Sequence, residues 1–185
     1  MRLTMAQFDH VEQLPLRDLI AYWLAAAGAR AMPARADIDP TRIPSLLPFV
    51  WLCDHLPETG RFRYRLMGDH VRHAYRDNVA GRFLDEVEPP TATAGIVDCL
   101  QRSVALPCVV HIDGWLYADT DKPTPGECVV LPLASDGARV DMILGATVYS
   151  WLESARRAVS IGDQIRTFTR IEVGALPEPS TAGEA

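Results

Sequence analysis

The stretch RFRYRLMGDHVRHAYRDNVAGRFLDE, residues 61–86, carries most of the information about the fold. Residues 61–67 alternate arginine with apolar side chains, and this period of two is typical of a half-buried strand. The alternation predicts that Phe62, Tyr64 and Leu66 point toward a core or cavity. The arginines between them then face solvent or an acidic neighbour.

The remainder of this stretch changes its period at Gly68. Over residues 69–76 the apolar side chains recur at helical spacing, and residues 78–81 (NVAG) predict a turn before a second apolar step. The helical part is dense in His, Arg and Tyr. Such a composition suits a bound ligand, a reaction or a solvated edge.

The clearest helix spans residues 14–29. Pro15 suits its first turn and Gly28 its end. Its apolar residues form one stripe, which must be buried either on the body of the protein or on a second copy. The stripe consists of Leu16, Leu19, Ile20, Trp23, Leu24 and Ala27.

Further strands and helices follow from the same patterns. Strands are predicted at 49–53, 107–117, 127–133 and 140–150, a longer helix at 92–104, and a short helical turn at 40–47 with Asp39 as its N-cap. Together with strand 61–67 they predict an α+β fold. Its five-stranded antiparallel sheet has the order 2-1-5-4-3, with helices on one face and an amphipathic helix at the N-terminus.

The C-terminal part gives weaker patterns. Residues 151–160 predict a short helix, and residues 165–173 alternate like one more strand. The composition of residues 175–185 is typical of disorder.

Composition limits the classes of function. The formal net charge of −6 and the pI near 5.3 argue against a nucleic-acid surface. No apolar run approaches the length of a membrane-spanning helix, and the N-terminus lacks the apolar core of a signal peptide. We therefore expect a cytoplasmic protein. The four cysteines lie far apart, which favours small buried side chains over a metal site.

Two pairs of side chains are candidates for chemistry. His70 and His73 lie at i, i+3, close enough to share a metal, but a solvated helix face with exposed histidines is the favoured interpretation. His111 and Asp113 point to one side of a predicted strand, either as a pair for proton transfer or as an edge hydrogen bond. The sequence contains no nucleotide-binding loop and no hydrolase motif.

Three stretches together resemble a PAS domain, most closely the bacterial subfamily of short single-domain PAS proteins. They are ADIDPTRIPSLLPFVWLCD (36–54), RFRYRLMGDHV (61–71) and YRDNVAGRFLDEV (75–87). The resemblance implies a five-stranded sheet that cups a small cavity under the central helices. It divides the chain into an N-terminal helical extension (1–35), a PAS-like domain (36–150) and a C-terminal extension (151–185), disordered at its end.

The resemblance leaves the cofactor unknown. Flavin-binding light sensors of this family carry a reactive cysteine shortly before an Arg-Phe-Leu step. Here residues 78–81 (NVAG), which precede Arg82, include no cysteine. A noncovalent flavin stays open. Haem-binding members use a histidine of the central helices, where His70 and His73 lie without the matching motif.

The resemblance implies a non-catalytic sensory module that binds a small ligand, a signalling protein partner, or both. The expected ligand-binding residues are Phe62, Tyr64, Leu66, His73, Tyr75 and Leu84. The helix over 14–29 is the expected surface for a homodimer. The alternative is a small cone-shaped α+β enzyme, an isomerase or dehydratase, which uses His111 and Asp113 or the carboxylate of Asp98.

Overall fold

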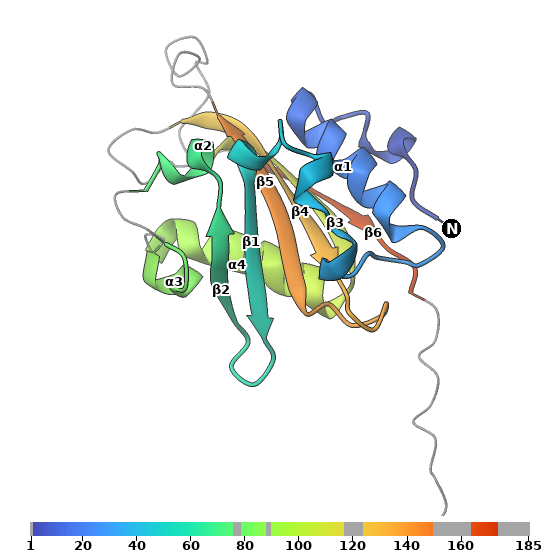
Figure 1. Cartoon of the computed structure of the whole chain (residues 1–185). Helices are drawn as coiled ribbons and strands as arrows, with labels where there is room; N and C mark the ends of the chain where they lie inside the picture. The colour runs from blue at the N-terminus through green and yellow to red at the C-terminus, as the bar shows by residue number, and fades with distance from the viewer. Residues whose placement is uncertain (1, 76–78, 88–89, 117–123, 150–163, 174–185) are drawn as a thin grey trace, which may run out of the picture.

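The computed structural model describes residues 2–75, 79–87, 90–116, 124–149 and 164–173. The strands form one antiparallel sheet in the order β2-β1-β5-β4-β3-β6 (Figure 1). Their bounds are β1 Val50–Leu56, β2 Arg61–Met67, β3 Cys108–Trp115, β4 Pro125–Leu133, β5 Met142–Tyr149 and β6 Gln164–Arg170. The predicted helix over 151–160 and the predicted disorder over 175–185 lie outside the described residues.

The α+β class and the predicted order of the first five strands are confirmed, but the sheet has one strand more. β6 pairs antiparallel with β3, from Cys108 opposite Arg170 to Gly114 opposite Gln164. Its alternating pattern predicted a strand without showing where it pairs, because a period of two contains no information about the neighbour. The C-terminal part therefore widens the sheet.

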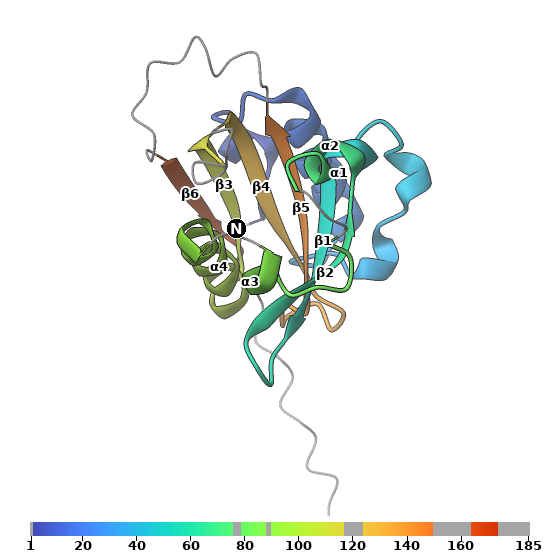
Figure 2. The same ribbon diagram turned by 90° about the vertical axis from the view of Figure 1, so that its left-hand side faces the viewer.

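Helices cover both faces of the sheet (Figure 2). Helix α1 (Leu14–Ala27) packs on β4 and β5 on one side, which we call the α1 face. On the other side, called the α4 face, α4 (Pro90–Ala105) packs on β3 and β4, while α3 (Leu84–Val87) lies beside β2. Helix α2 (Asp69–Arg72) contacts the end of β5. No helix of the described residues is long and apolar enough to cross a bilayer.

The apolar stripe of α1 is buried against the protein's own sheet. The buried residues of this helix are Leu16, Leu19, Ile20, Trp23 and Ala27. The Trp23 indole Nε1–H also donates a hydrogen bond to the Pro132 carbonyl of β4, at 3.0 Å. Gly28 ends the helix with a φ of 59°, a conformation that glycine adopts without strain. The stripe is thus occupied within one chain.

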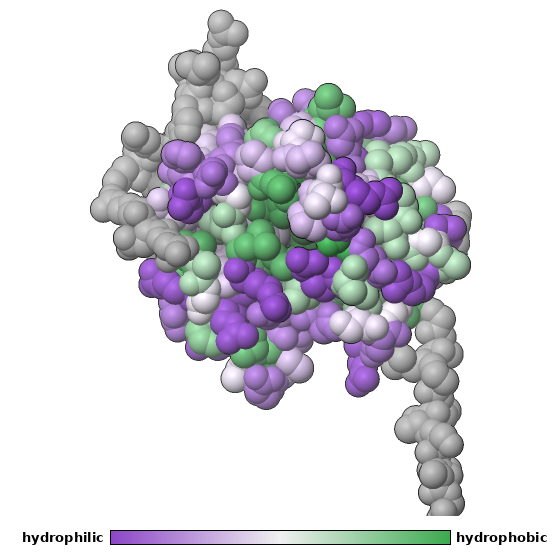
Figure 3. Space-filling model, viewed as in Figure 1, coloured by the Kyte–Doolittle hydropathy of each residue, from purple (hydrophilic) through white to green (hydrophobic). Residues whose placement is uncertain are grey.

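A β-bulge changes which side chains β2 directs to each face. Leu52 lies opposite Leu66, but Cys53 lies opposite Tyr64, so Arg65 is the extra residue. The prediction that Leu66 shares a face with Tyr64 is therefore wrong, because the bulge shifts the alternation by one residue. Leu66 is on the α1 face and is 39% exposed. In Figure 3 apolar side chains gather over β1 and β5 on this face, bordered by hydrophilic ones.

The short helical segments are shorter than their sequence patterns predicted. The turn over 40–47 resolves into two 3₁₀ helices, Pro40–Arg42 and Leu47–Phe49, with the Asp39 carboxylate accepting from the Thr41 N–H as the predicted N-cap. The helix over 69–76 is described only as α2, Asp69–Arg72. Two further 3₁₀ helices, Met5–Phe8 and Arg35–Asp37, flank α1 in the chain.

Gly145→Ala is expected to destabilise the fold. A Cβ at this position would lie 2.1 Å from the Trp51 ring, so the indole must move, at a cost of about 1–3 kcal/mol. Chemical denaturation measures the free energy of unfolding. Combining the change with Trp51→Phe, whose ring is smaller, should recover part of the loss in a double-mutant cycle. Strict additivity of the two changes would contradict this packing.

Candidate functional site

Three aromatic side chains meet on the α4 face. Trp51 of β1 and Tyr64 of β2 are each 4% exposed, and their ring centroids lie 6.4 Å apart at 83°. Tyr75, in the turn region after α2, meets Tyr64 edge-on at the same centroid distance. Edge-to-face contacts of this kind fix the orientation of each ring. The three rings, here called the aromatic cluster, join two strands and the segment that follows α2.

A chain of uncharged polar groups lies beside the aromatic cluster. The Trp51 Nε1–H donates to Thr147 Oγ1 of β5 at 3.0 Å, and this hydroxyl donates to the Cys128 thiol of β4 at 3.5 Å. Gly145 makes the arrangement possible, because the indole occupies the space that a side chain there would fill. Thr147 and Cys128 are both buried. The hydrogen-bonding groups therefore belong to rigid central strands.

His70 connects α2 to the same end of the sheet. Its ring lies between those of Phe49 and Tyr149, with centroids 4.8 Å and 4.3 Å away, and the Tyr149 hydroxyl donates to the His70 carbonyl. Burial lowers the pKa of His70, and repulsion from His73 lowers it further. Burial also raises the pKa of Tyr149. Both side chains are therefore uncharged at neutral pH.

The four strands beneath these groups, β1, β2, β4 and β5, send no charged side chain to this face, and the arginines on the same face, Arg166 and Arg170, belong to the terminal strand β6. From the strand pairings, the α4 face of β1, β2, β4 and β5 contains neither Asp, Glu, Lys nor Arg. Its side chains are Trp51, Cys53, His55, Phe62, Tyr64, Met67, Cys128, Val130, Pro132, Ile143, Thr147 and Tyr149. Burial lowers the pKa of His55, the one of these that titrates near neutrality. A charged group bound here would find no counter-ion in these four strands.

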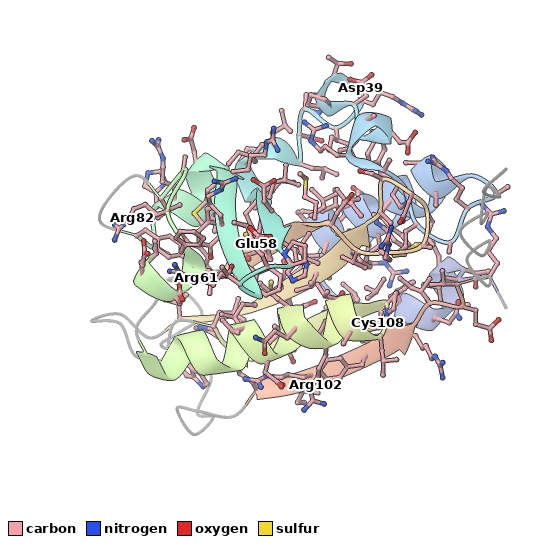
Figure 4. The ribbon with its side chains drawn as sticks, turned by 90° about the horizontal axis from the view of Figure 1, so that it is seen from below. Asp39, Glu58, Arg61, Arg82, Arg102 and Cys108 are labelled. Carbon is pink, nitrogen blue, oxygen red and sulfur yellow. The ribbon has the colours of Figure 1, made fainter. Side chains whose placement is uncertain are left out.

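The segment 79–87, which contains α3, is fastened to the outer edge of β2. The Tyr64 N–H donates to the Arg82 carbonyl at 2.9 Å, and the Gly81 N–H donates to the Tyr64 carbonyl at 2.7 Å. Arg61 binds the Asp85 carboxylate through two nitrogens and also reaches Glu86, while its guanidinium lies 3.6 Å from the centroid of the Phe83 ring (Figure 4). This group of contacts is called the Arg61 clasp.

The arginines of β2 have acidic partners, as predicted. Arg61 binds the acidic residues of α3, and Arg63 and Arg65 share the Asp54 carboxylate at 3.3 Å and 3.1 Å. Arg65 reaches the same carboxylate as Arg63 because the bulge places both next to Asp54.

The structure brings together four of the six predicted ligand-binding residues. Phe62, Tyr64 and Leu84 are buried in one apolar core, and the half-buried Tyr75 packs against it. Leu66 is on the opposite face, and His73 is exposed beside the Asp69 carbonyl of its own helix. Trp51, Thr147 and Cys128 were not predicted. Their strands were, but only the register between strands shows that these three side chains meet.

His111 has a different carboxylate partner from the one that the sequence suggested. Its Nε2 lies 2.9 Å from Glu127 Oε2 of β4, with both side chains about nine-tenths buried or more. Asp113 lies directly opposite Glu127 in the β3–β4 pairing. The predicted histidine–carboxylate contact thus exists across strands, on the α1 face. Asp98, the third candidate for catalysis, binds Arg102 on the exposed side of α4 at 2.9 Å.

Metal ligands do not gather in the described part of the chain. The described residues contain no group of three His, Cys, Asp or Glu side chains arranged to hold a metal ion. His70 and His73 point to different surroundings, one packed between aromatic rings and the other exposed. The four cysteines are thiols buried in the core, as the sequence indicated.

The fold agrees with a comparison of the chain with known families. The family model of the PAS domain matches residues 11–148, and the chain therefore belongs to the PAS domain family. No curated protein matches the chain. Membership indicates a sensory or signalling module, and PAS domains are in general non-catalytic. The matched region includes α1 as well as the first five strands.

Thr147→Val is expected to lower the free energy of unfolding by about 1–3 kcal/mol, because the similar shape is kept while the buried Trp51 Nε1–H loses its acceptor. Thermal or chemical denaturation measures the loss. The matched control is Thr169→Val on the end strand β6, where a change of less than about 0.5 kcal/mol is expected. Equal losses in the free energy of unfolding at the two positions would show that the Trp51–Thr147 hydrogen bond does not stabilise the fold measurably.

Proposed function

We propose that this PAS domain is a non-catalytic sensory module that binds a small, uncharged, largely flat ligand on the α4 face and signals through a protein partner. The observation behind the proposal is the aromatic cluster, which lies with its neighbouring hydroxyl and thiol groups over four strands, β1, β2, β4 and β5, that send no charged side chain to this face. Sites for small molecules are mostly apolar, with a few polar groups that fix orientation.

The chemistry of the cluster limits the class of ligand. The edge-to-face rings offer apolar surface, and the Trp51–Thr147–Cys128 chain offers neutral hydrogen-bonding groups. A charged ligand would lose its hydration without gaining a counter-ion from the strands beneath the cluster, which costs several kcal/mol or more. An aromatic or heteroaromatic molecule with one or two polar atoms fits these groups best.

Within this proposal Phe62, Tyr64, Tyr75 and Leu84 form the apolar part of the site. Tyr64 is central, because its ring meets both other aromatic side chains and its backbone holds residues 81 and 82. A ligand that displaces the Tyr64 ring would also disturb these backbone hydrogen bonds. The signal would then leave through the segment 79–87, which the Arg61 clasp holds at the surface.

A reducing compartment suits this protein. All four cysteines are buried thiols, and burial raises the pKa of Cys99 and Cys108, which keeps them protonated. Thiols of this kind are usual in cytosolic proteins. We therefore place the proposed sensor in the cytoplasm.

Native mass spectrometry of the purified protein, together with its visible spectrum, tests the proposal. We expect a copurified or added neutral aromatic compound to bind one per chain. Tyr64→Leu should weaken this binding severalfold, because the ring contacts and the tyrosine hydroxyl are lost. Arg63→Gln, on the opposite face of the same strand, is the control and should bind normally. Equal binding by all three proteins, or a preference for charged compounds, would contradict the proposed site.

We also propose that the protein forms a homodimer through the outer side of α1. The apolar stripe is occupied by the protein's own sheet, so self-association would use the exposed side, where Leu14 is 66% exposed. Leu14→Glu should shift sedimentation toward the monomer, and Asp18→Asn on the same side should not. Trp23 is unsuitable for this test, since it is 1% exposed and its replacement would damage the fold. A monomer in the unchanged protein would contradict the dimer.

A further inference from the structure

The N-terminal arm, residues 5–13, is held on the α1 face by two different kinds of contact. Phe8 and Val11 are 0% and 1% exposed and enter the apolar core. Glu127 Oε2 accepts the backbone N–H groups of Glu12 and Gln13, at 3.1 Å and 3.5 Å, where α1 begins. A carboxylate at the N-terminal end of a helix also interacts favourably with the helix dipole. The arm and the start of α1 thus depend on one buried carboxylate from β4.

Two histidines meet where the arm crosses β3. The ring of His10, on the arm, lies edge-on to that of His111, with the centroids 5.0 Å apart. His111 is buried and binds Glu127, whereas His10 is exposed on its outer side, so it exchanges protons with solvent. Histidine is the side chain whose charge changes in the physiological pH range. The arm therefore carries a titratable group directly over a buried one.

The buried carboxylate nearest to this pair faces His111 and not His10. It belongs to Glu127 of β4. On the arm, Asp9 is 76% exposed and lies 3.6 Å from Arg17 of α1, and Glu12 is exposed. The side chain of Asp113 is half-buried one step along β3, and β6 places Thr167 opposite His111. A positive charge on His10 would therefore lie against the ring of His111 without a buried carboxylate of its own.

We propose that the N-terminal arm is a pH-sensitive latch, which leaves the α1 face when His10 is protonated against the buried His111–Glu127 pair. Release would uncover Phe8 and Val11 and remove the backbone N–H groups of residues 12 and 13 from Glu127. This property is separate from ligand binding on the α4 face.

The direction of the pH dependence follows from the pKa shifts. Burial lowers the pKa of His10, and repulsion from His111 lowers it further, against weaker attraction by Glu127 and Asp9. A lowered histidine pKa stabilises the docked arm above pH 6.5, and this stabilisation is lost as the pH falls through the lowered value. Glu127 differs: its burial raises its pKa, but hydrogen bonds from His111 and the arm outweigh this and lower it below 4.5. The carboxylate thus stays ionised while His10 titrates.

Hydrogen exchange of the full chain tests the latch through protection factors, which remove the intrinsic pH dependence of exchange. Between pH 7.5 and pH 5.5, protection of the Glu12 and Gln13 amides should fall severalfold, while that of the central strand β4 stays constant. His10→Phe keeps an aromatic contact without a charge and should abolish the fall. His55→Phe, a half-buried histidine remote from the arm, should respond like the unchanged protein.

Three results would overturn the latch. The arm amides of the unchanged protein could keep their protection at pH 5.5. The arm amides of the His10→Phe variant could also lose as much protection on acidification as those of the unchanged protein. The third is an equal loss in β4, which would mean that the whole domain opens and the arm has no separate transition.

Discussion

The contact between the Trp51 indole and the backbone at Gly145 is the constraint on which the α4 face depends. β1 and β5 are neighbours in the sheet, although about 90 residues separate them in the chain. Because residue 145 has no side chain, the indole lies over β5, and its Nε1–H reaches Thr147 two residues further along. The other side of the ring meets Tyr64 of β2. One glycine thus joins the first hairpin to the four strands that follow and sets the place of the Trp51 ring, which Tyr64 contacts.

Much of the architecture was readable from local pattern, and most of the site was not. The α1 stripe and the alternation of the strands are local properties of the sequence, and the Asp39 N-cap is set within three residues. The bulge at Arg65 has no comparable signal, since it depends on how β1 and β2 pair, and it moved Leu66 to the other face. The Trp51–Thr147 and His111–Glu127 contacts are also matters of register. His111 was paired with Asp113 because the two share a strand, whereas its partner comes from the next strand.

The two faces of the sheet have different side-chain chemistry, and different elements pack on them. On the α4 face the side chains of β1, β2, β4 and β5 are uncharged, and burial lowers the pKa of the histidines there. On the α1 face a carboxylate and two histidines are placed beneath the N-terminal arm. The two faces are linked through the strands themselves, because alternate residues of each strand point to opposite faces.

The sheet edges have a consequence for how the protein behaves at high concentration. Backbone from residues 81–83 pairs with the outer side of β2, so that flank is already hydrogen-bonded. At the other end β6 carries Arg166 and Arg170, with threonines between them. Cationic side chains along a terminal strand oppose the approach of an identical strand, because two rows of like charge would have to stack. Both flanks of the widened sheet thus oppose the addition of a further strand, one because its backbone is already paired and the other through its charge.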